Sequence, residues 1–534
     1  MSLARYRSRR AGEACARALD PEVDAKCRMT VRPFAHDETA GRTKPQRAAG
    51  GSLTRVATLR DLSRAAGEVF VGLALLFSPA LAADEDKDLD LIPPAAQQSA
   101  PSVPAAAPAT TGNGTQRNYL EDAFSATPLR DSLAVPFPPP APASWEDRLF
   151  LDSRDEWHIG DDVTLTYSGR FNPRAANDIP FPSHENVLNE LREAFVSWQA
   201  ADGTWIDLGR VNLKSGVAEG FNPTDFFRTR AVVEPLTADP TVLREDRLGT
   251  LMLLAQHVWT GGSITAAYAP KVTQPTAIYT NIDLPSFDPM LDRTNAENRL
   301  LLKGSLAIAN GFSPELLLYH AGDRTKLGAN LTIGLGQQTV GYAEWAGGVD
   351  GSLLDDALRY GRETGTLPEH APAVIPDDAA QYFRNQLAVG LSYTPPDTRL
   401  TFNVEYHYAQ AGFSPGDWRN WFAAASRHGT IPGVDAALWY IRSYAQDQQD
   451  PMSRHSAFLR ADWVDAFVPD LELTVLANMD LEDGSALVQA TADYYLSRNW
   501  TIGGLASFTF GTRRSDFGSL PQAGSILLRL VRYL

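Results

Sequence analysis

Residues 401–408 of the chain read Thr401-Phe402-Asn403-Val404-Glu405-Tyr406-His407-Tyr408. Apolar and polar side chains alternate along this stretch, and a period of two places them on opposite faces of a β-strand. About ten residues with this alternation are enough for a tilted strand to cross a lipid bilayer. The stretch therefore predicts a transmembrane strand with one face toward lipid and the other toward water.

The same alternation recurs between residues 146 and 534. No stretch there reaches the roughly eighteen apolar residues of a membrane-spanning helix. We therefore predict an all-β fold, a transmembrane antiparallel up-and-down β-barrel of about 16 strands, within a range of roughly 14 to 18. The strands are expected near residues 162–171, 186–199, 204–214, 246–258, 262–270, 297–310, 313–321, 325–336, 338–347, 382–393, 398–409, 453–465, 470–480, 484–495, 498–510 and 523–534.

The connections between these expected strands alternate in length. Tight turns such as Ala201-Asp202-Gly203 and Thr260-Gly261 alternate with connections that are mostly long, among them 215–245 and 410–452. A water-soluble β-sandwich also alternates polar and apolar residues, but short turns at one end and long loops at the other are typical of outer-membrane barrels. An even number of strands puts both termini of the barrel at the short-turn end, which we expect to be periplasmic.

The sequence ahead of the barrel has three parts of different composition. A basic and then apolar segment ends in Ala80-Leu81-Ala82, as a cleaved signal peptide does. Both cysteines, Cys15 and Cys27, precede that expected cleavage site, so the exported chain would contain none. The expected domains are a polar extension or misassigned start at 1–54, a signal peptide at 55–82, a disordered linker rich in proline and alanine at 83–145, and the barrel at 146–534.

Charge and motifs exclude several classes of function. The net charge is −16, and because the first 82 residues hold 14 basic and 8 acidic side chains, the rest of the chain is near −22. An acidic chain argues against a nucleic-acid partner. No CxxC, HExxH or phosphate-binding loop occurs, and His455 and Ser456, as neighbours on a strand, face opposite sides. We therefore expect no enzyme, no cofactor and no metal site.

One segment resembles a known motif. Residues 209–227 read Gly-Arg-Val-Asn-Leu-Lys-Ser-Gly-Val-Ala-Glu-Gly-Phe-Asn-Pro-Thr-Asp-Phe-Phe, in which a strand ending in Gly-Arg enters a loop with an Asn-Pro-Thr-Asp core. This resembles a motif of proteobacterial outer-membrane porins, the alginate-export barrels and related uncharacterised families. The resemblance covers fewer than twenty residues. It implies a passive channel of monomeric type and does not identify the solute.

The turn chemistry of this segment suggests a loop that folds into the barrel and narrows its pore, with a well-packed extracellular loop as the alternative. We expect Val211 and Leu213 to face lipid, and Thr224 or Asp225 to cap a short helix that follows. The residues of the loop motif are Gly216, Gly220, Asn222, Pro223, Asp225, Phe226 and Phe227.

Polar residues on the wet faces of the strands are candidates for the pore wall, because barrels of this size enclose an aqueous channel. The predicted lining and selectivity residues are Arg170, Arg210, Asn212, Lys214, Lys303, Glu405, His407, Arg460, Asp462, Glu472 and Asp493.

The connection 410–452 contains two helical patterns, at 417–427 and 435–446, with several aromatic residues. Aromatic faces stack on sugar rings, so saccharide capture is one interpretation; packing of the loop on itself is the other.

These patterns together favour an outer-membrane channel for passive diffusion of small hydrophilic solutes. The alternatives are an outer-membrane component of polysaccharide or lipid export and, last, a barrel enzyme. The expected partners are outer-membrane lipid and lipopolysaccharide, the barrel-insertion machinery and small solutes. The sequence does not fix the oligomeric state.

Overall fold

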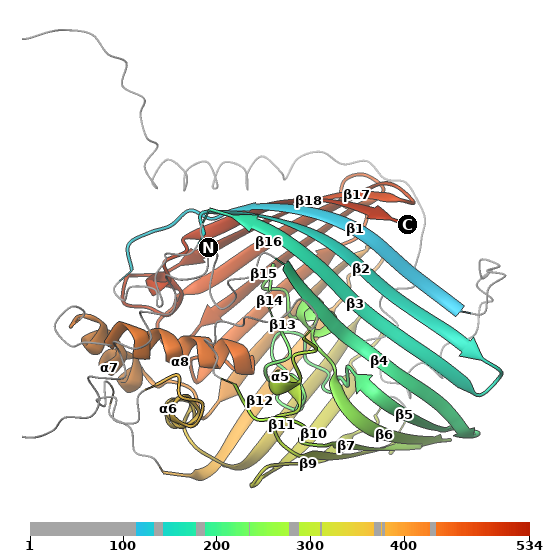
Figure 1. The fold of residues 1–534 in the computed structure, drawn as a ribbon. Coiled ribbons are helices and arrows are strands. Elements are labelled where there is room, and N and C mark those ends of the chain that lie inside the picture. The colour runs from blue at the N-terminus through green and yellow to red at the C-terminus, as the bar shows by residue number, and fades with distance from the viewer. Residues whose placement is uncertain are drawn as a thin grey trace, which may run out of the picture. The chain divides into compact units, whose positions relative to one another are not determined.

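The computed structural model describes residues 114–132, 143–177, 187–233, 235–276, 288–309, 312–367, 375, 380–427 and 434–534. Its eighteen strands form one sheet in which each strand is antiparallel to the next, and β1 also pairs with β18, so the sheet is closed (Figure 1). The strands are β1 (Gly114–Ala126), β2 (Trp145–Ile159), β3 (Val163–Ala176), β4 (Val187–Ala201), β5 (Thr204–Val211), β6 (Thr250–Trp259), β7 (Gly262–Ala269), β8 (Arg299–Leu306), β9 (Glu315–Ala321), β10 (Arg324–Gly334), β11 (Thr339–Asp350), β12 (Tyr382–Tyr393), β13 (Leu400–Ala409), β14 (His455–Trp463), β15 (Leu471–Asp480), β16 (Ala486–Ser497), β17 (Trp500–Phe510) and β18 (Gly524–Tyr533). The helices are α4 (Pro240–Glu245), α5 (Leu291–Thr294), α6 (Leu353–Glu363), α7 (Pro415–Ala425), α8 (Val434–Gln448) and the 3-10 helix η2 (Phe517–Ser519).

The all-β barrel is confirmed, but it has 18 strands rather than about 16. The sixteen strands expected from the sequence correspond to β3–β18, and two more precede them. The sequence conceals β1 because Asp122 lies on its outer face, between exposed Leu120 and Phe124, and interrupts the apolar alternation. The second addition, β2, contains Leu149 and Leu151, both exposed.

The barrel therefore begins at Gly114, inside the segment 83–145 that we expected to be a disordered linker. That expectation is wrong for residues 114–126, which pair with β2 along their whole length and with β18 from Tyr119 to Ala126. The expected extension at 1–54 and signal peptide at 55–82 lie outside the described residues.

The strands are apolar outside and polar inside. On β13, Val404 is 53% exposed on the outer wall, whereas Asn403, Glu405 and His407 on the inner face are each 2% exposed. A soluble β-sandwich has the opposite distribution, with apolar side chains meeting in its core. The outer surface of this barrel is instead that of a protein immersed in hydrocarbon.

Aromatic side chains cluster near the ends of the strands. Trp198, Trp259, Tyr393, Tyr494 and Trp500 are exposed beside the short turns. At the opposite end the exposed aromatic residues include Trp145, Tyr268, Tyr382, Phe383 and Phe508. Two such rings are typical of barrels that cross a membrane, because amphipathic rings favour the lipid headgroup level.

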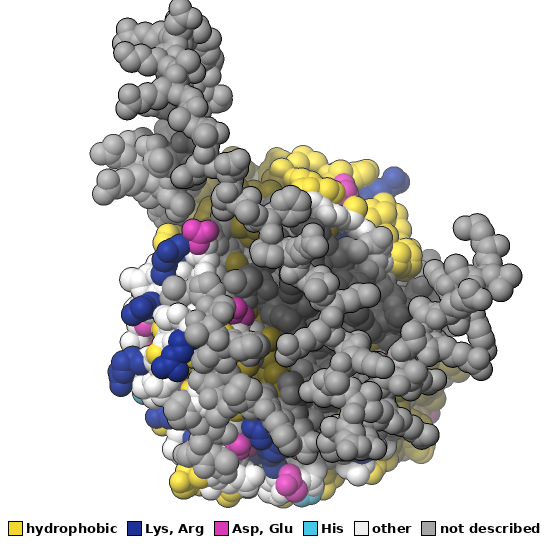
Figure 2. Space-filling model, turned by 60° about the vertical axis from the view of Figure 1, so that its left-hand side comes forward, with side chains coloured by type: hydrophobic (Ala, Val, Ile, Leu, Met, Phe, Trp, Pro, Cys, Tyr) yellow, Lys and Arg dark blue, Asp and Glu magenta, His cyan; other side chains and the backbone are white. Residues whose placement is uncertain are grey.

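The long connections gather at one end of the barrel, where Figure 1 shows α6, α7 and α8, and the C-terminal end of β18 lies at the other end. Figure 2 shows hydrophobic side chains along the upper barrel wall and charged side chains of both signs on the left of the view. The connection between β9 and β10, which we expected to be a short one at 322–324, is the tight turn Gly322-Asp323.

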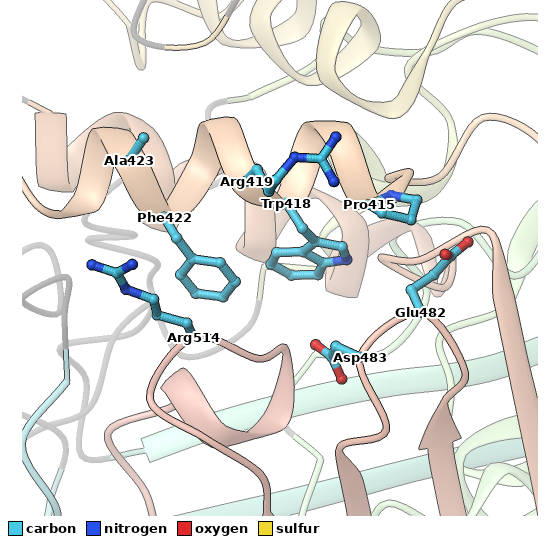
Figure 3. Close-up of a pocket in the computed structure, with 8 residues that line it drawn as sticks. All are labelled: Pro415, Trp418, Arg419, Phe422, Ala423, Glu482, Asp483 and Arg514. Carbon is cyan, nitrogen blue, oxygen red and sulfur yellow. The ribbon is translucent and has the colours of Figure 1, made fainter.

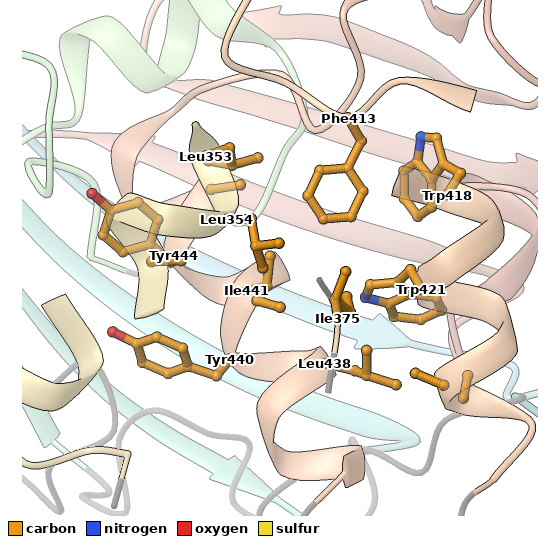
Figure 4. Close-up of a cluster of buried hydrophobic side chains, with 14 of the residues drawn as sticks. Leu353, Leu354, Ile375, Phe413, Trp418, Trp421, Leu438, Tyr440, Ile441 and Tyr444 are labelled. Atoms are coloured by element: carbon orange, nitrogen blue, oxygen red, sulfur yellow. The ribbon is translucent and has the colours of Figure 1, made fainter. Parts of the chain in front are cut away.

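The helices of two long connections form a small core of their own, which we call the helical cap (Figure 4). It contains α6, α7 and α8, and the last two confirm the helical patterns expected at 417–427 and 435–446. Trp421 and Tyr440 are fully buried in this core. In the described part of the chain, no helix has the length and hydropathy needed to span a bilayer.

Candidate functional site in the barrel interior

The connection between β5 and β6, residues 212–249, runs inside the ring of strands (Figure 1), and we call it the inward loop. It bonds to β11, β13, β14 and β16, which are distant from β5 and β6 in the order of the sheet. Of the two alternatives raised by the sequence, the loop that folds into the barrel is therefore the one observed.

Glu344 on β11 anchors the first half of the inward loop. Its buried carboxylate accepts hydrogen bonds from the backbone N–H of Ala218 at 2.5 Å and from the side-chain amide of Asn222 at 3.0 Å. The N–H of Val217 and the hydroxyl of Thr224, the latter at 3.1 Å, donate to the same carboxylate. A charge can be buried here because the loop itself replaces the lost water.

Glu405 on β13 is a second carboxylate anchor. It accepts the backbone N–H groups of Glu219 at 2.6 Å and Gly220 at 2.9 Å, and the hydroxyl of Tyr342 at 2.7 Å. The ring nitrogen Nε2 of His407 lies 2.7 Å from its other side. Hydrogen bonds to a charged group offset the cost of its burial, so these contacts explain why a carboxylate occupies a site without solvent.

The loop approaches these anchors so closely that two positions require glycine. A Cβ atom on Gly216, whose φ is +98°, would lie 2.5 Å from Oε1 of Glu344. One on Gly220 would lie 2.5 Å from Cγ of Phe458. Both glycines of the motif thus serve close packing of the loop against the wall.

Phe226 and Phe227 attach the loop to the inner wall formed by β6–β9. The ring of Phe226 stacks on Tyr319 with centroids 4.6 Å apart, and Phe227 meets the same ring edge-on at 5.9 Å. Val211 belongs to this buried cluster, so our expectation that it faces lipid is wrong. The described residues 221–231 form turns, and the short helix expected there is not present.

Arg210 does not point into the lumen. It lies opposite Leu251 in the register of β5 and β6, on the same side as exposed Leu253. Its guanidinium donates to the carbonyl oxygen of Gly249 at 2.9 Å and to that of Pro289. The inner and outer faces of this strand are therefore the reverse of those we expected. Val211 faces inward, and Arg210 is buried under a neighbouring connection instead of lining the lumen.

The two ends of the inward loop are tied together at its base. Asp225 forms a two-pronged ion pair with Arg247 at 2.7 and 3.2 Å, and this arginine also donates to the side-chain oxygen of Asn212. Lys214 forms an ion pair with Glu245. Arg247 is 1% exposed, so removal of its partner would leave a buried charge.

The second half of the loop meets the far wall of the barrel. Asp239, which caps α4, lies 3.1 Å from Arg460 on β14, and the same guanidinium contacts Asp462 at 2.6 Å. Gln489 on β16 accepts the backbone N–H of Ala238 at 2.8 Å. The loop thus spans the interior from β5 to β16.

Asp246 attaches the end of the loop to β2, β3 and β4. Its carboxylate lies 3.0 Å from Arg170 and 2.9 Å from Arg192, and both arginines also bind Asp152. Oppositely charged side chains satisfy one another here, which offsets the cost of burying Asp152 and Arg192.

Part of the inner wall carries charged residues that make no hydrogen bond or ion pair with the described residues of the loop. Asp493 and Arg529 form an ion pair at 2.6 Å and keep 15% and 33% of their side-chain area exposed. Glu472 accepts the hydroxyl of Tyr495 at 2.8 Å. Lys303 forms an ion pair on the opposite wall at 3.6 Å.

The structure therefore separates the predicted lining residues into groups. Those that contact the inward loop or belong to it are Arg170, Asn212, Lys214, Glu405, His407 and Arg460; Asp462 binds the arginine that does so, and Lys303, Glu472 and Asp493 lie on the inner face elsewhere. Four further residues of the site were not predicted from the sequence: Glu344, Asp239, Asp246 and Arg247. Glu344 could have been identified, because it is the only charged residue in the expected strand 338–347.

A separate cavity of about 460 Å³ lies beside α7 (Figure 3). Trp418 and Phe422 point into it from the helix, toward the connections that carry Asp483 and Arg514. The two aromatic rings stack on each other at 5.4 Å and are 4% and 6% exposed. Packing of the cap on itself, rather than display of aromatic faces to sugars, accounts for these rings.

Within the described residues, no group of three or more His, Cys, Asp or Glu side chains is arranged to hold a metal ion. No protein-family profile matches the chain, and no curated protein matches it.

Solved structures of outer-membrane proteins are similar to it. They include Pseudomonas aeruginosa OccK5 (OpdH), with 9% identity, 79% of this chain and 98% of that chain covered, and a TM-score of 0.46. Acinetobacter baumannii OccAB1 has 10% identity, the same coverage of 79% and 98%, and a TM-score of 0.47. Pseudomonas aeruginosa OpdK, solved with vanillate, has 10% identity, coverage of 78% and 98%, and a TM-score of 0.42. Identities this low carry no information about the solute of this chain.

Proposed function

We propose that this chain is a channel of the bacterial outer membrane through which small hydrophilic solutes diffuse passively. The observation that carries the proposal is a closed ring of eighteen strands with exposed apolar side chains outside and charged ones inside. In hydrocarbon only a chain that satisfies its own backbone groups is stable, and a closed barrel does so. A barrel of this size encloses an aqueous channel unless its interior is filled.

The inward loop is the constriction of the proposed channel. Its apolar side fills the interior next to β6–β9, where Phe226 and Phe227 pack. The partly exposed charges, including Arg529 and Asp493, lie on the other wall. A passage lined by ionised groups favours polar solutes over apolar ones. The lining residues of the proposal are Arg170, Lys214, Lys303, Arg460, Asp462, Glu472 and Asp493, while Glu405, His407 and Asn212 hold the loop.

The orientation of the barrel in the membrane follows from its proposed location in the outer membrane. Barrels of the outer membrane have short turns on the periplasmic side, so we place the short-turn end and both ends of the sheet there. The segment 55–82 would then direct export, and the insertion machinery would assemble the barrel. Outer-membrane lipid and lipopolysaccharide would contact the apolar outer wall.

Planar-bilayer recording of the purified full-length chain tests the proposal. Stepwise current increases with a linear current–voltage relation are expected, together with swelling of proteoliposomes in small neutral sugars. Protein that migrates as a folded, heat-modifiable barrel but gives neither current nor swelling would refute the channel.

One group in the interior has the composition of a hydrolase triad. Ser456 Oγ lies 3.5 Å from Nδ1 of His407, whose Nε2 faces Glu405. His407, however, is 2% exposed and lies between Phe221 and Phe458, so a substrate carbonyl cannot reach the serine while His407 acts as base. In the proposal Glu405 and His407 hold the loop. Ser456 approaches this pair only at 3.5 Å from His407, so Ser456→Ala should leave conductance unchanged.

A further inference from the structure

The C-terminal end of α8 binds the inward loop from outside the proposed pore. We propose that Asp447 and Asp450 are positioning residues that hold the loop in place, so that the helical cap sets the width of the channel. The inference rests on the proposed function, and it assigns to the cap a role that the barrel wall alone does not have.

Asp447 makes the central contacts. Its carboxylate binds Nε of Arg230 at 2.9 Å and Nη2 of Arg293 at 2.6 Å, and its carbonyl oxygen accepts the N–H of Arg230 at 2.7 Å. All three side chains are less than one-tenth exposed. Arg230 belongs to the inward loop and Arg293 to the connection between β7 and β8, so one carboxylate joins three segments.

The residues that follow Asp447 extend these contacts. Asp450 binds Nη2 of Arg228 at 2.6 Å, and the side chain of Gln449 donates to the carbonyl oxygen of Arg228 at 3.0 Å. Arg228 in turn donates to the carbonyl oxygens of Asn222 and Asp225, at 2.7 and 3.2 Å. The cap is thereby linked through one arginine to the part of the loop that Glu344 holds.

Electrostatics favour this arrangement. The C-terminal end of a helix carries a partial negative charge, and arginine side chains placed there are stabilised by it. Two arginines of the loop approach this end of α8, and each is paired with a carboxylate.

The cap is a firm support because it has its own core. Leu438 and Ile441 of α8 are buried against α6 and α7, and Arg442 is bound to Asp516 of the connection between β17 and β18 at 2.7 Å. A loop fixed to such a support cannot shift toward or away from the open wall unless the ion pairs break.

Single-channel recording of Asp447→Asn in the full-length chain tests the inference. The variant should switch between conductance levels about tenfold more often than the parent, since a buried charge pair is weakened, or show a changed open conductance. Glu363→Gln is the matched control, because Glu363 forms an exposed ion pair within α6 of the same cap. It should behave as the parent does.

The outcomes separate the two proposals. A parent that conducts, with Asp447→Asn and Asp450→Asn both indistinguishable from it, overturns the positioning role and leaves the channel intact. A parent that does not conduct overturns the proposed function itself. If Asp447→Asn does not yield a heat-modifiable barrel, Asp450→Asn and Asp447→Glu are recorded instead. Altered gating in the first and parental gating in the second support the inference.

Discussion

At the scale of the residue, the interior is organised by carboxylates that bind backbone N–H groups. Glu344 and Glu405 each accept several hydrogen bonds from the inward loop, and no arginine or lysine contacts either carboxylate within ion-pair distance among the described residues. Burying a carboxylate is costly unless its oxygens are satisfied, and successive N–H groups of a tight loop do this well. These two residues therefore specify one position of the loop.

Glu344→Gln should release the first half of the inward loop. The amide cannot accept all the hydrogen bonds made by residues 217–224, and each buried group left unsatisfied costs about 1–3 kcal/mol. Hydrogen exchange at Val217 and Ala218 should become about tenfold to hundredfold faster, a ratio that follows from the same energies. Mass spectrometry of the purified barrel measures it. Glu472→Gln, on the inner face but away from the loop, is the control, and equal protection in both variants would contradict the anchoring role.

Glu219 makes the proposed channel sensitive to pH. Burial is the largest cause that raises the pKa of its carboxyl to about 8, nearby carboxylates add to it, and Arg460 opposes it. The loop carboxyl is therefore mostly protonated at neutral pH in the folded state and ionises above about pH 8. Because the folded state holds this proton more tightly than the unfolded state, the group lowers stability as pH rises from its ordinary range through about 8.

Preference for cations over anions should consequently increase between about pH 7 and pH 9, the interval in which Glu219 gains its charge. Reversal potentials in a salt gradient measure this, with Glu219→Gln as the variant that should stay constant. The charged groups that face Glu219 are Arg460, Glu405, Asp462 and Asp239. The same pH profile in the variant would assign the effect to another group.

At the scale of the element, the sequence could predict which stretches form strands. It could not predict what each face of a strand contacts. Stretches such as 401–408 contain their own evidence, because a strand between lipid and water must alternate. In β18 the residues from Ile526 to Leu528 are all apolar, which breaks the alternation. The strand is nevertheless regular, because Leu527 and Val531 face inward and Ile526 and Leu528 face outward, so its inner face is partly apolar. The inner and outer faces expected for β5 were wrong for a related reason, because apolar Val211 faces the packed inward loop rather than lipid.

A charge on the outer face of β15 should cost much more than the same charge one residue away. Val475 is exposed near the middle of the strand, whereas Thr474 faces inward and donates to Asp462 at 2.7 Å. Val475→Arg should lower the free energy of unfolding by about 2–4 kcal/mol, because arginine at the bilayer midplane is costly. Thr474→Arg is the control and places its charge beside a carboxylate.

Both variants are unfolded with urea in phospholipid vesicles, and the folded fraction is measured from the change in gel migration that heating causes. The two free energies of unfolding are then compared. A loss for Thr474→Arg as large as for Val475→Arg would mean that the two faces of β15 do not differ in environment.

At the scale of the whole molecule, the site depends on contacts that no local pattern reveals. The N–H of Val217 reaches a carboxylate 127 positions away, and that of Glu219 one 186 positions away. The sequence could predict an inward loop from its turn residues, but its anchors depend on which strands the closed ring places opposite β5. The ring itself depends on β1, in which Asp122 interrupts the apolar alternation of the outer face.

Removal of β1 should therefore abolish the barrel rather than shrink it. Because β1 is antiparallel to both β2 and β18, those two strands run parallel to each other, and they cannot close the sheet by antiparallel pairing once β1 is lost. Each open edge would leave its backbone groups unsatisfied in lipid, at several kcal/mol per group. A chain that lacks residues 114–126 should give no heat-modifiable species, whereas deletion of residues 98–110, also 13 residues long, should leave it unchanged. A folded, conducting barrel from the first deletion would show that β1 is dispensable and that the sheet closes by another pairing.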